Sequence, residues 1–369
     1  MIPFARMIKY GNVTTPAPNI ISVQGGSTRN SFYILYDNGE LYAFYDNFYG
    51  AFGNGTRTNI TDKFTLINTN VKMFSASDTA CVVLKNDNTI WHSGSTLSYT
   101  NSSNFNLTPT NITSYFSTID INSISKLIVL QGGITIMLAN GNVYGIGANG
   151  LGQMGTASAI TTLTLLVSGV LDFVGNNYNT GYITQSNDFY ITGYNNVGQL
   201  GTGNTTNRSS YALLASNVNT AQISANGTHL NYLDGSVKAC GVSSTLGINI
   251  TTGNTTTLTS VVPSLSLSFD KIYLSSGTSS FGISSGTLYS TGISLTSSLG
   301  SGSTVPTYSQ TISPIGINFD GITVLVSATY MWKGTNLYYA GSTTTDPNKG
   351  STNLTSFTKV TANIPYLTV

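Results

Sequence analysis

Hydrophobic and polar residues alternate in short runs along this chain, as they do in β-strands. The stretch from 134 to 147 shows the pattern: an apolar run, Ile134 to Leu138, is followed by Asn140-Gly141 and then by a second run, Val143 to Ile146. Strands place alternate side chains on opposite faces, and Asn-Gly favours a two-residue hairpin turn because both residues tolerate a positive φ. The stretch therefore predicts a β-hairpin.

The hairpin pattern recurs seven times. In each copy two turn residues, a polar residue, an apolar residue and a large residue follow one another, and the large residues are Tyr42, Trp91, Tyr144, Tyr190, Lys238, Tyr289 and Tyr338. Neighbouring copies are 46 residues (144 to 190) to 53 residues (91 to 144) apart. A period of about fifty residues that consists of strands, with no helical periodicity, is typical of a β-propeller.

A glycine-rich loop follows most of these hairpins. Glycine stands three residues after the large residue in every copy except the first, where Tyr45 takes its place. The stretches 152–155 (GQMG) and 198–201 (GQLG) then match closely. Because glycine lacks a Cβ atom, it permits the sharp bends that such a loop needs, so we expect irregular backbone here and no helix.

The fullest copy of the loop, residues 193–201, reads GYNNVGQLG, and residues 147–155 are the next best. With this G-x-N-x-x-G-Q-L-G pattern the chain, from about Ile21 to Val360, resembles the regulator of chromosome condensation repeat family. The resemblance implies a seven-bladed β-propeller. That family includes nucleotide exchange factors, ubiquitin-ligase modules and a secreted β-lactamase inhibitor, so the resemblance implies a fold and no single function. The kelch propeller matches the period, but its glycine doublet and paired aromatic residues do not recur in register.

We expect residues 1–369 to form one all-β domain, a seven-bladed β-propeller with about four antiparallel strands per blade. Residues 21–369 supply the seven repeats. Residues 1–20 contain one expected strand, 4–10, and a connector with two prolines. We expect this N-terminal strand to join blade seven and so close the ring, because closure removes an open sheet edge; the strand at 357–360 competes for the same place. The large aromatic residues of the repeat are expected to pack between blades.

Charged residues are scarce, at 7%, and the net charge is only +1. Ser, Thr, Asn and Gly replace them as the polar surface, a composition that we associate with extracellular or virion proteins. The 14 basic residues are spread along the chain without a cluster, which argues against binding of nucleic acid. No stretch reaches the length of about 18 apolar residues that a membrane span requires, and the N-terminus lacks the apolar core of a secretory signal, so no membrane insertion is expected.

Residues that could support catalysis or bind a metal are few. His92 and His229, the two histidines, belong to different repeats and have no cysteine nearby in sequence, so we expect no zinc site. Glu40 is the single glutamate, and several aspartates fall at hairpin turns, where they bind their own backbone. Cys81 and Cys240 lie in the second and fifth repeats and are expected to be buried thiols. We therefore expect no catalytic residues, no metal and no cofactor, and a protein that is not an enzyme.

Tyr45, Phe48 and Tyr49 are the candidate contact residues, because they stand in the one copy that lacks the usual glycine. The alternative for them is ordinary packing within the first blade. The favoured hypothesis is a structural or recognition propeller of a virion or cell surface, which binds other proteins of that assembly or a glycan through its loops. The alternative is an intracellular, cytoplasmic regulatory adaptor or exchange-factor-like propeller. An enzyme with aspartates gathered on one face is a third possibility.

Overall fold

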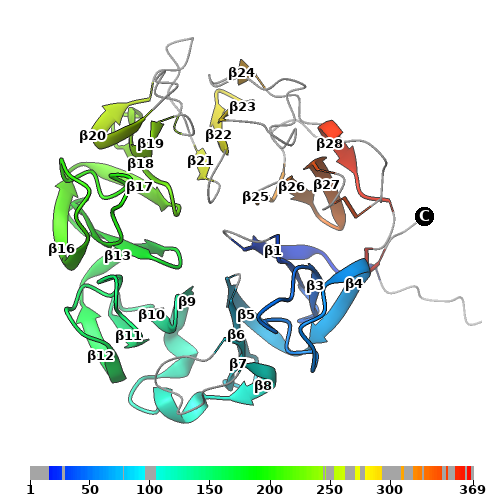
Figure 1. Ribbon diagram of the computed structural model, residues 1–369. Coiled ribbons are helices and arrows are strands. Elements are labelled where there is room, and N and C mark those ends of the chain that lie inside the picture. The colour runs from blue at the N-terminus through cyan, green and yellow to red at the C-terminus, as the bar shows by residue number, and fades with distance from the viewer. Residues whose placement is uncertain are drawn as a thin grey trace, which may run out of the picture.

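The computed structural model describes residues 16–26, 30–77, 79–95, 105–243, 246, 253–261, 271–274, 279–292, 309–310, 319–325, 328–342, 346–347, 354–361 and 364–366. These residues form seven antiparallel four-stranded sheets in a ring, six well developed and one small (Figure 1). The all-β propeller expected from the repeat is confirmed. Among the described residues, no helix is long and apolar enough to cross a membrane.

Each sheet is built from four strands that are consecutive in the chain. The first three sheets contain β1 (Ile20–Gly25), β2 (Phe32–Tyr36), β3 (Leu41–Tyr45) and β4 (Ile60–Asn68); β5 (Val71–Ala76), β6 (Ala80–Lys85), β7 (Ile90–Gly94) and β8 (Asn106–Asn111); and β9 (Ile124–Leu130), β10 (Gly133–Leu138), β11 (Val143–Gly147) and β12 (Ile160–Val167). Two 3₁₀ helices, η1 (Thr113–Phe116) and η2 (Ile121–Ser123), lie between β8 and β9.

The fourth and fifth sheets contain β13 (Val170–Gly175), β14 (Asn179–Thr184), β15 (Phe189–Gly193) and β16 (Arg208–Ala215), and β17 (Val218–Ile223), β18 (Gly227–Tyr232), β19 (Val237–Val242) and β20 (Asn254–Ser260). The small sixth sheet contains β21 (Lys271–Leu274), β22 (Ser279–Ser284), β23 (Thr287–Gly292) and β24 (Ser309–Gln310). The seventh contains β25 (Gly321–Val324), β26 (Ala328–Lys333), β27 (Asn336–Gly341) and β28 (Leu354–Lys359). The first strand of each sheet lies nearest the centre of the ring (Figure 1).

The hairpin turns that the sequence predicts are present, and their side chains explain the repeated residues. Asn38 Oδ1 accepts a hydrogen bond from the backbone N–H of Glu40 at 3.0 Å, and Asp234 Oδ1 accepts one from Ser236 at 2.9 Å. Gly39, which follows Asn38, has a φ of 80°. Asn and Asp are favoured at such turns because their side-chain oxygen accepts a hydrogen bond from the backbone N–H two residues on.

The same backbone hydrogen bond joins neighbouring sheets around the ring. A turn carbonyl of one sheet accepts from the first residue of the next: Gly39 O from Val71 N at 2.9 Å, and Gly141 O from Val170 N at 3.0 Å. Gly334 O accepts from Ile20 N at 2.9 Å, which joins the seventh sheet to the first by the same bond. The seventh and first sheets are therefore joined by the same backbone hydrogen bond that joins other neighbouring sheets of the ring.

The outermost strand of the seventh sheet is β28, from the C-terminal part of the chain. Four consecutive strands fill this sheet, and residues 4–10, which we expected to complete it, lie outside the described residues. The described C-terminal segment 364–366 instead lies against the first sheet. Tyr366 donates a hydrogen bond to Glu40, and Tyr36 donates one to the Pro365 carbonyl at 3.3 Å. These contacts tie the C-terminal part of the chain to the first sheet.

The core lies between the sheets. Tyr42 packs against a cluster shared by the first and seventh sheets, Trp91 against one shared by the first and second, and Tyr144 against one shared by the second and third. These aromatic residues are half-buried, whereas the apolar residue before each, such as Leu41 or Ile90, is buried. Each sheet thus shields the apolar side of its neighbour, as the repeat requires.

Candidate functional site

The three aromatic residues suggested by the sequence do not all lie together. Tyr45 ends β3 with a φ of 75°, and it packs against the core between the first and seventh sheets, with its ring 6.3 Å from that of Phe44. Phe48 and Tyr49 lie in the following loop, where their rings meet edge to face at 5.0 Å. The side chain of Phe48 is 43% exposed. The loop therefore presents Phe48 and Tyr49, while Tyr45 packs against the core.

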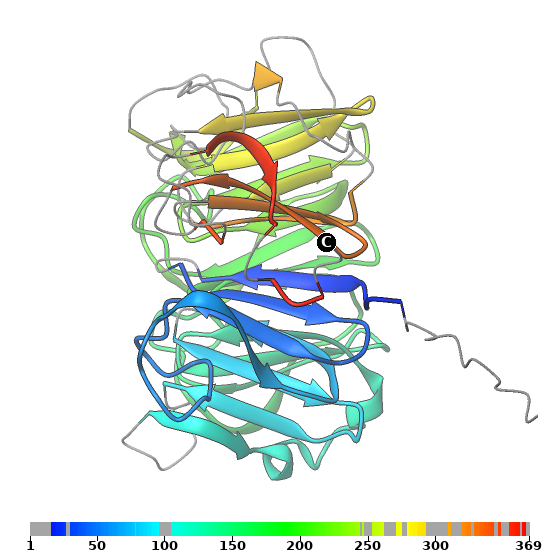
Figure 2. The ribbon, with the colours of Figure 1, turned by 90° about the vertical axis from the view of Figure 1, so that its right-hand side faces the viewer.

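Two further residues complete this surface. The Phe105 ring, just before β8, lies 5.9 Å from that of Tyr49 and is 36% exposed. The Arg57 guanidinium lies over both phenylalanine rings, with its carbon 4.6 Å from the centroid of Phe48 and 4.3 Å from that of Phe105. We call Phe48, Tyr49, Arg57 and Phe105 the aromatic–arginine cluster. The first and second sheets both contribute to it, and the loop that presents it is the blue one at the left of Figure 2.

A buried asparagine holds the loop that carries the cluster. Asn47 Oδ1 accepts from Phe52 N at 3.0 Å, and its amide donates to Asn54 Oδ1 at 3.2 Å and to the Thr56 carbonyl at 3.0 Å. Arg57 Nε donates to the carbonyl of Phe48, which fixes the arginine to the same loop. An amide that replaces backbone partners in this way makes a loop rigid without regular secondary structure.

The loop also packs against the second sheet. A Cβ atom at Gly50, which has a φ of 73°, would lie 2.4 Å from Leu107 Cδ2, so this glycine permits the close approach of loop and strand. Ser93 Oγ of β7 donates to the Ala51 carbonyl at 2.7 Å. These contacts bring Phe105, at the start of the second sheet's outer strand, beside a loop of the first.

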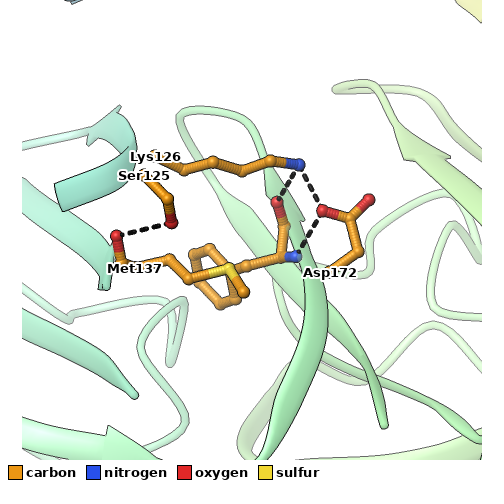
Figure 3. A network of polar contacts seen from close by, with 5 residues as sticks. Ser125, Lys126, Met137 and Asp172 are labelled. Carbon is orange, nitrogen blue, oxygen red and sulfur yellow. Dashed lines mark hydrogen bonds and ion pairs between the residues drawn. The ribbon is translucent and has the colours of Figure 1, made fainter. Parts of the chain in front are cut away.

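A separate hollow, with a volume of about 410 Å³, lies where the inner strands β5, β9, β13 and β17 face the centre of the ring. Apolar residues such as Met73, Ile128 and Val174 line it. Lys126 forms an ion pair with Asp172 and donates to the Phe173 carbonyl at 3.3 Å (Figure 3). Because Lys126 and Asp172 lie on the third and fourth sheets, this ion pair joins the two sheets, and it neutralises the one charged side chain among the described residues that line the hollow.

The histidines and cysteines are buried. Burial lowers the pKa of His92 to about 4 and that of His229 to about 4, and it raises the pKa of the thiols of Cys81 and Cys240 to about 12. Buried neutral groups of this kind belong to the packing between strands and are not positioned to react with a ligand. Within the described ranges, no three His, Cys, Asp or Glu side chains gather in a group that could hold a metal ion.

Solved structures show what this architecture resembles. Human WBSCR16 superposes with a TM-score of 0.70 at 13% identity, over 88% of this chain and 94% of that one. Prp20p of Saccharomyces cerevisiae gives 0.67 at 16% identity over 86% and 82%, and yeast RCC1 (Prp20) bound to Kap60 gives 0.63 at 17% over 83% and 77%. The chain has the fold of the RCC1 propellers. No family model and no curated protein matches the sequence, and at these identities the likeness shows the fold alone.

The motif that suggested the RCC1 fold is structural in this chain. Asn195 is buried; its Oδ1 accepts from Leu200 N at 2.9 Å, and its amide donates to the carbonyls of Asn204 and Thr206 at 2.9 and 3.0 Å. Gln199 donates to the Ala225 carbonyl of the next sheet at 3.1 Å. In this loop the asparagine and the glutamine of the G-x-N-x-x-G-Q-L-G pattern therefore bind backbone groups.

The sequence reasoning missed Arg57 and Phe105. They lie 48 residues apart (57 to 105), in different repeats and outside the motif. Arg57 carried a weak signal, because charged residues make up only 7% of the chain. Phe105 carried none that distinguishes it from a core aromatic residue. Only the packing of the first loop on β8 brings the two together.

Proposed function

We propose that this chain is a non-enzymatic recognition propeller that binds a protein partner through the aromatic–arginine cluster. The observation that carries the proposal is the composition and exposure of that cluster: two phenylalanines more than a third exposed, a tyrosine and an arginine. Tyrosine and arginine are enriched in the few residues that dominate the energy of protein interfaces, and rigid aromatic side chains bind at a low entropic cost.

The scaffold suits this role. Asn47 and the close approach of Gly50 to Leu107 hold the loop before any partner arrives, so little ordering is left to oppose binding. The burial of both histidines and both cysteines among the described residues supports a role without catalysis. The low content of charged residues, with uncharged polar residues in their place, supports display on a virion or cell surface, with a partner from the same assembly.

An intracellular adaptor or exchange-factor-like role is the second candidate, and the likeness to Prp20p favours it. The structure of that protein was described together with its binding to Gsp1p and histones. The two proposals differ in where the protein is found. Recovery in purified particles or culture medium would favour the first, and recovery from cells in complex with a small GTPase would favour the second.

The binding role is tested with two matched variants. Phe48→Ala combined with Tyr49→Ala removes the exposed rings, and Tyr115→Ala removes an aromatic residue that is 37% exposed elsewhere, on η1. The partner identified by cross-linking in the native assembly should bind wild type and Tyr115→Ala alike, with a loss of at least about tenfold for the double variant. Equal binding by all three proteins would remove the cluster from the interface. Binding to a glycan array in place of any protein would change the class of ligand.

A further inference from the structure

Arg57 is an exposed arginine whose position is nevertheless fixed. Its Nε donates to the Phe48 carbonyl, and its guanidinium carbon lies within 4.6 Å of two ring centroids. A guanidinium carries five N–H donors in one plane, and the bond from Nε uses one of them. Four donors on the two terminal nitrogens remain for a ligand.

The charge of Arg57 has no carboxylate partner among the residues that the structure describes. Lys126 and Lys333 form ion pairs with Asp172 and Asp320, whereas within the described part of the chain the guanidinium of Arg57 interacts with two rings and one carbonyl. The face of an aromatic ring attracts a cation. The N–H donors of a guanidinium point outward in the plane of the group, so a ring stacked over that plane leaves them free to bind oxygen. The cluster therefore combines a fixed, unpaired fork of donors with adjacent apolar surface.

We propose that Arg57 is a carboxylate-binding site, and that it takes an acidic side chain of the partner protein with an apolar group beside it. A carboxylate accepts two parallel N–H bonds from a guanidinium, and such charge-assisted pairs are stronger than hydrogen bonds between neutral groups. The exposed rings of Phe48 and Phe105 then cover the apolar neighbour. A lysine could supply the charge but not the planar pair of bonds. This inference rests on the proposed function, because it names the chemistry of the partner at the same cluster.

The test uses 3-phenylpropionate as the probe, since it joins one carboxylate to one apolar ring, and 3-phenylpropionamide as its neutral counterpart. The full-length ¹⁵N-labelled protein is titrated with each, and the Nε–H resonance of Arg57 is followed by NMR with that of Arg208 as an internal reference. We expect a saturable shift of the Arg57 signal with the acid, binding at least about tenfold weaker with the amide, and no shift of Arg208. Equal shifts with acid and amide would overturn the proposal.

Two substitutions separate charge from geometry. Arg57→Gln should abolish binding of the acid, and Arg57→Lys, which keeps the charge, should weaken it by about tenfold. Circular dichroism and the melting temperature, compared with wild type, establish that both variants are folded. Retained binding in folded Arg57→Gln would overturn the assignment, as would tighter binding of N-acetylneuraminic acid than of 3-phenylpropionate, which would make the ligand an acidic sugar.

The failure of this inference can be told from that of the proposed function. If the double variant lacking Phe48 and Tyr49 loses the partner while Arg57→Gln keeps it, recognition by the cluster stands and the carboxylate site falls. If Arg57 binds the acid while the double variant keeps the partner, the proposed function falls and the anion site stands by itself.

Discussion

The loops of the fourth and fifth sheets follow equivalent strands, β15 and β19, but different side chains hold them. In the fourth sheet the side chain of Asn195 forms three hydrogen bonds with the loop backbone: its oxygen accepts one and its amide nitrogen donates two. In the fifth, Ser243 takes that place, and its hydroxyl lies 2.8 Å from the hydroxyl of Thr255. The Leu246 carbonyl of the same loop is bound by His229 Nε2 at 3.2 Å. Among the described residues, a hydroxyl and a histidine thus bind the chain after β19, where a single amide does so after β15.

The first sheet clarifies what this difference means. It keeps the asparagine, as Asn47, but has Ala51 where the fourth sheet has Gln199, and Tyr45 where the others have glycine. The amide holds the loop, so neighbouring positions are free to carry other residues, and Phe48, Tyr49 and Arg57 occupy them. The residues that hold the loop, which we call the frame, are therefore separable from the residues that the loop displays. Substitutions in the frame should lower stability, and substitutions of displayed residues should not.

The largest expected effect comes from Asn195→Ala. It removes three hydrogen bonds to the loop backbone, at Leu200, Asn204 and Thr206, and leaves the buried N–H of Leu200 without its partner, so the free energy of unfolding should fall by about 3 kcal/mol. Ser243→Ala, the matched change in the fifth sheet, should cost about 1 kcal/mol. Urea denaturation of both variants gives the two values. Equal losses would contradict the difference drawn between the loops.

Acid should act on the second and fifth sheets, which carry the buried histidines, and spare the loop of the fourth. Burial lowers the pKa of His229 to about 4, below the value of about 6.5 for an exposed histidine. As the pH falls, the unfolded chain therefore binds a proton first, so stability present above about pH 6.5 is lost as the pH approaches about 4. The loss should reach about 2 to 3 kcal/mol for His229, and His92 should add a similar amount.

This pH dependence is measured as the free energy of unfolding at about pH 7 and about pH 4 in wild type and in His229→Gln. The variant should show a shallower decline, and hydrogen exchange in acid should rise near Leu246 before it rises near Leu200. An unchanged slope in His229→Gln would show that other groups control acid stability.

Two glycines of the fourth-sheet loop isolate its contact with the fifth. Gly198 and Gly203 both have a φ of 81°, so the backbone strain of an alanine is matched. A Cβ at Gly198 would lie 2.8 Å from Thr256 Cα, whereas one at Gly203 would meet nothing within 4 Å. We expect Gly198→Ala to cost about 2 kcal/mol and Gly203→Ala about 1 kcal/mol, compared by thermal unfolding. A reversed order would mean that the two sheets are less closely packed at this joint.

The smallest effect on stability is expected for a displayed residue. Phe48→Ala removes a ring that is 43% exposed, so its cost should stay within about 0.5 kcal/mol, while Asn47→Ala in the same loop should cost about 3 kcal/mol. Phe48→Ala should nonetheless weaken partner binding. If the two substitutions destabilise the protein equally, then Phe48 belongs to the frame rather than to the displayed set.

The sequence predicted the hairpins and the ring because both depend on local chemistry that repeats. Asn38-Gly39 and Asn140-Gly141 fix turns by their own conformational preferences, and seven copies then require neighbours to cover them. Tyr45 and the aromatic–arginine cluster depend on contacts between sheets. Tyr45 occupies a glycine position and packs toward the seventh sheet, and Phe105 reaches Arg57 only through the contact of Gly50 with Leu107. No period in one sequence reports such long-range contacts.

The joint between the seventh and first sheets has a mechanical consequence. It carries the hydrogen bond from Ile20 to Gly334, and Tyr366 adds a tie to Glu40 on the first sheet. A pulling force applied to residues 16 and 366 would therefore load this joint before any other. The hydrogen bond between Tyr366 and Glu40 would bear the tension first, and the propeller would open between its seventh and first sheets.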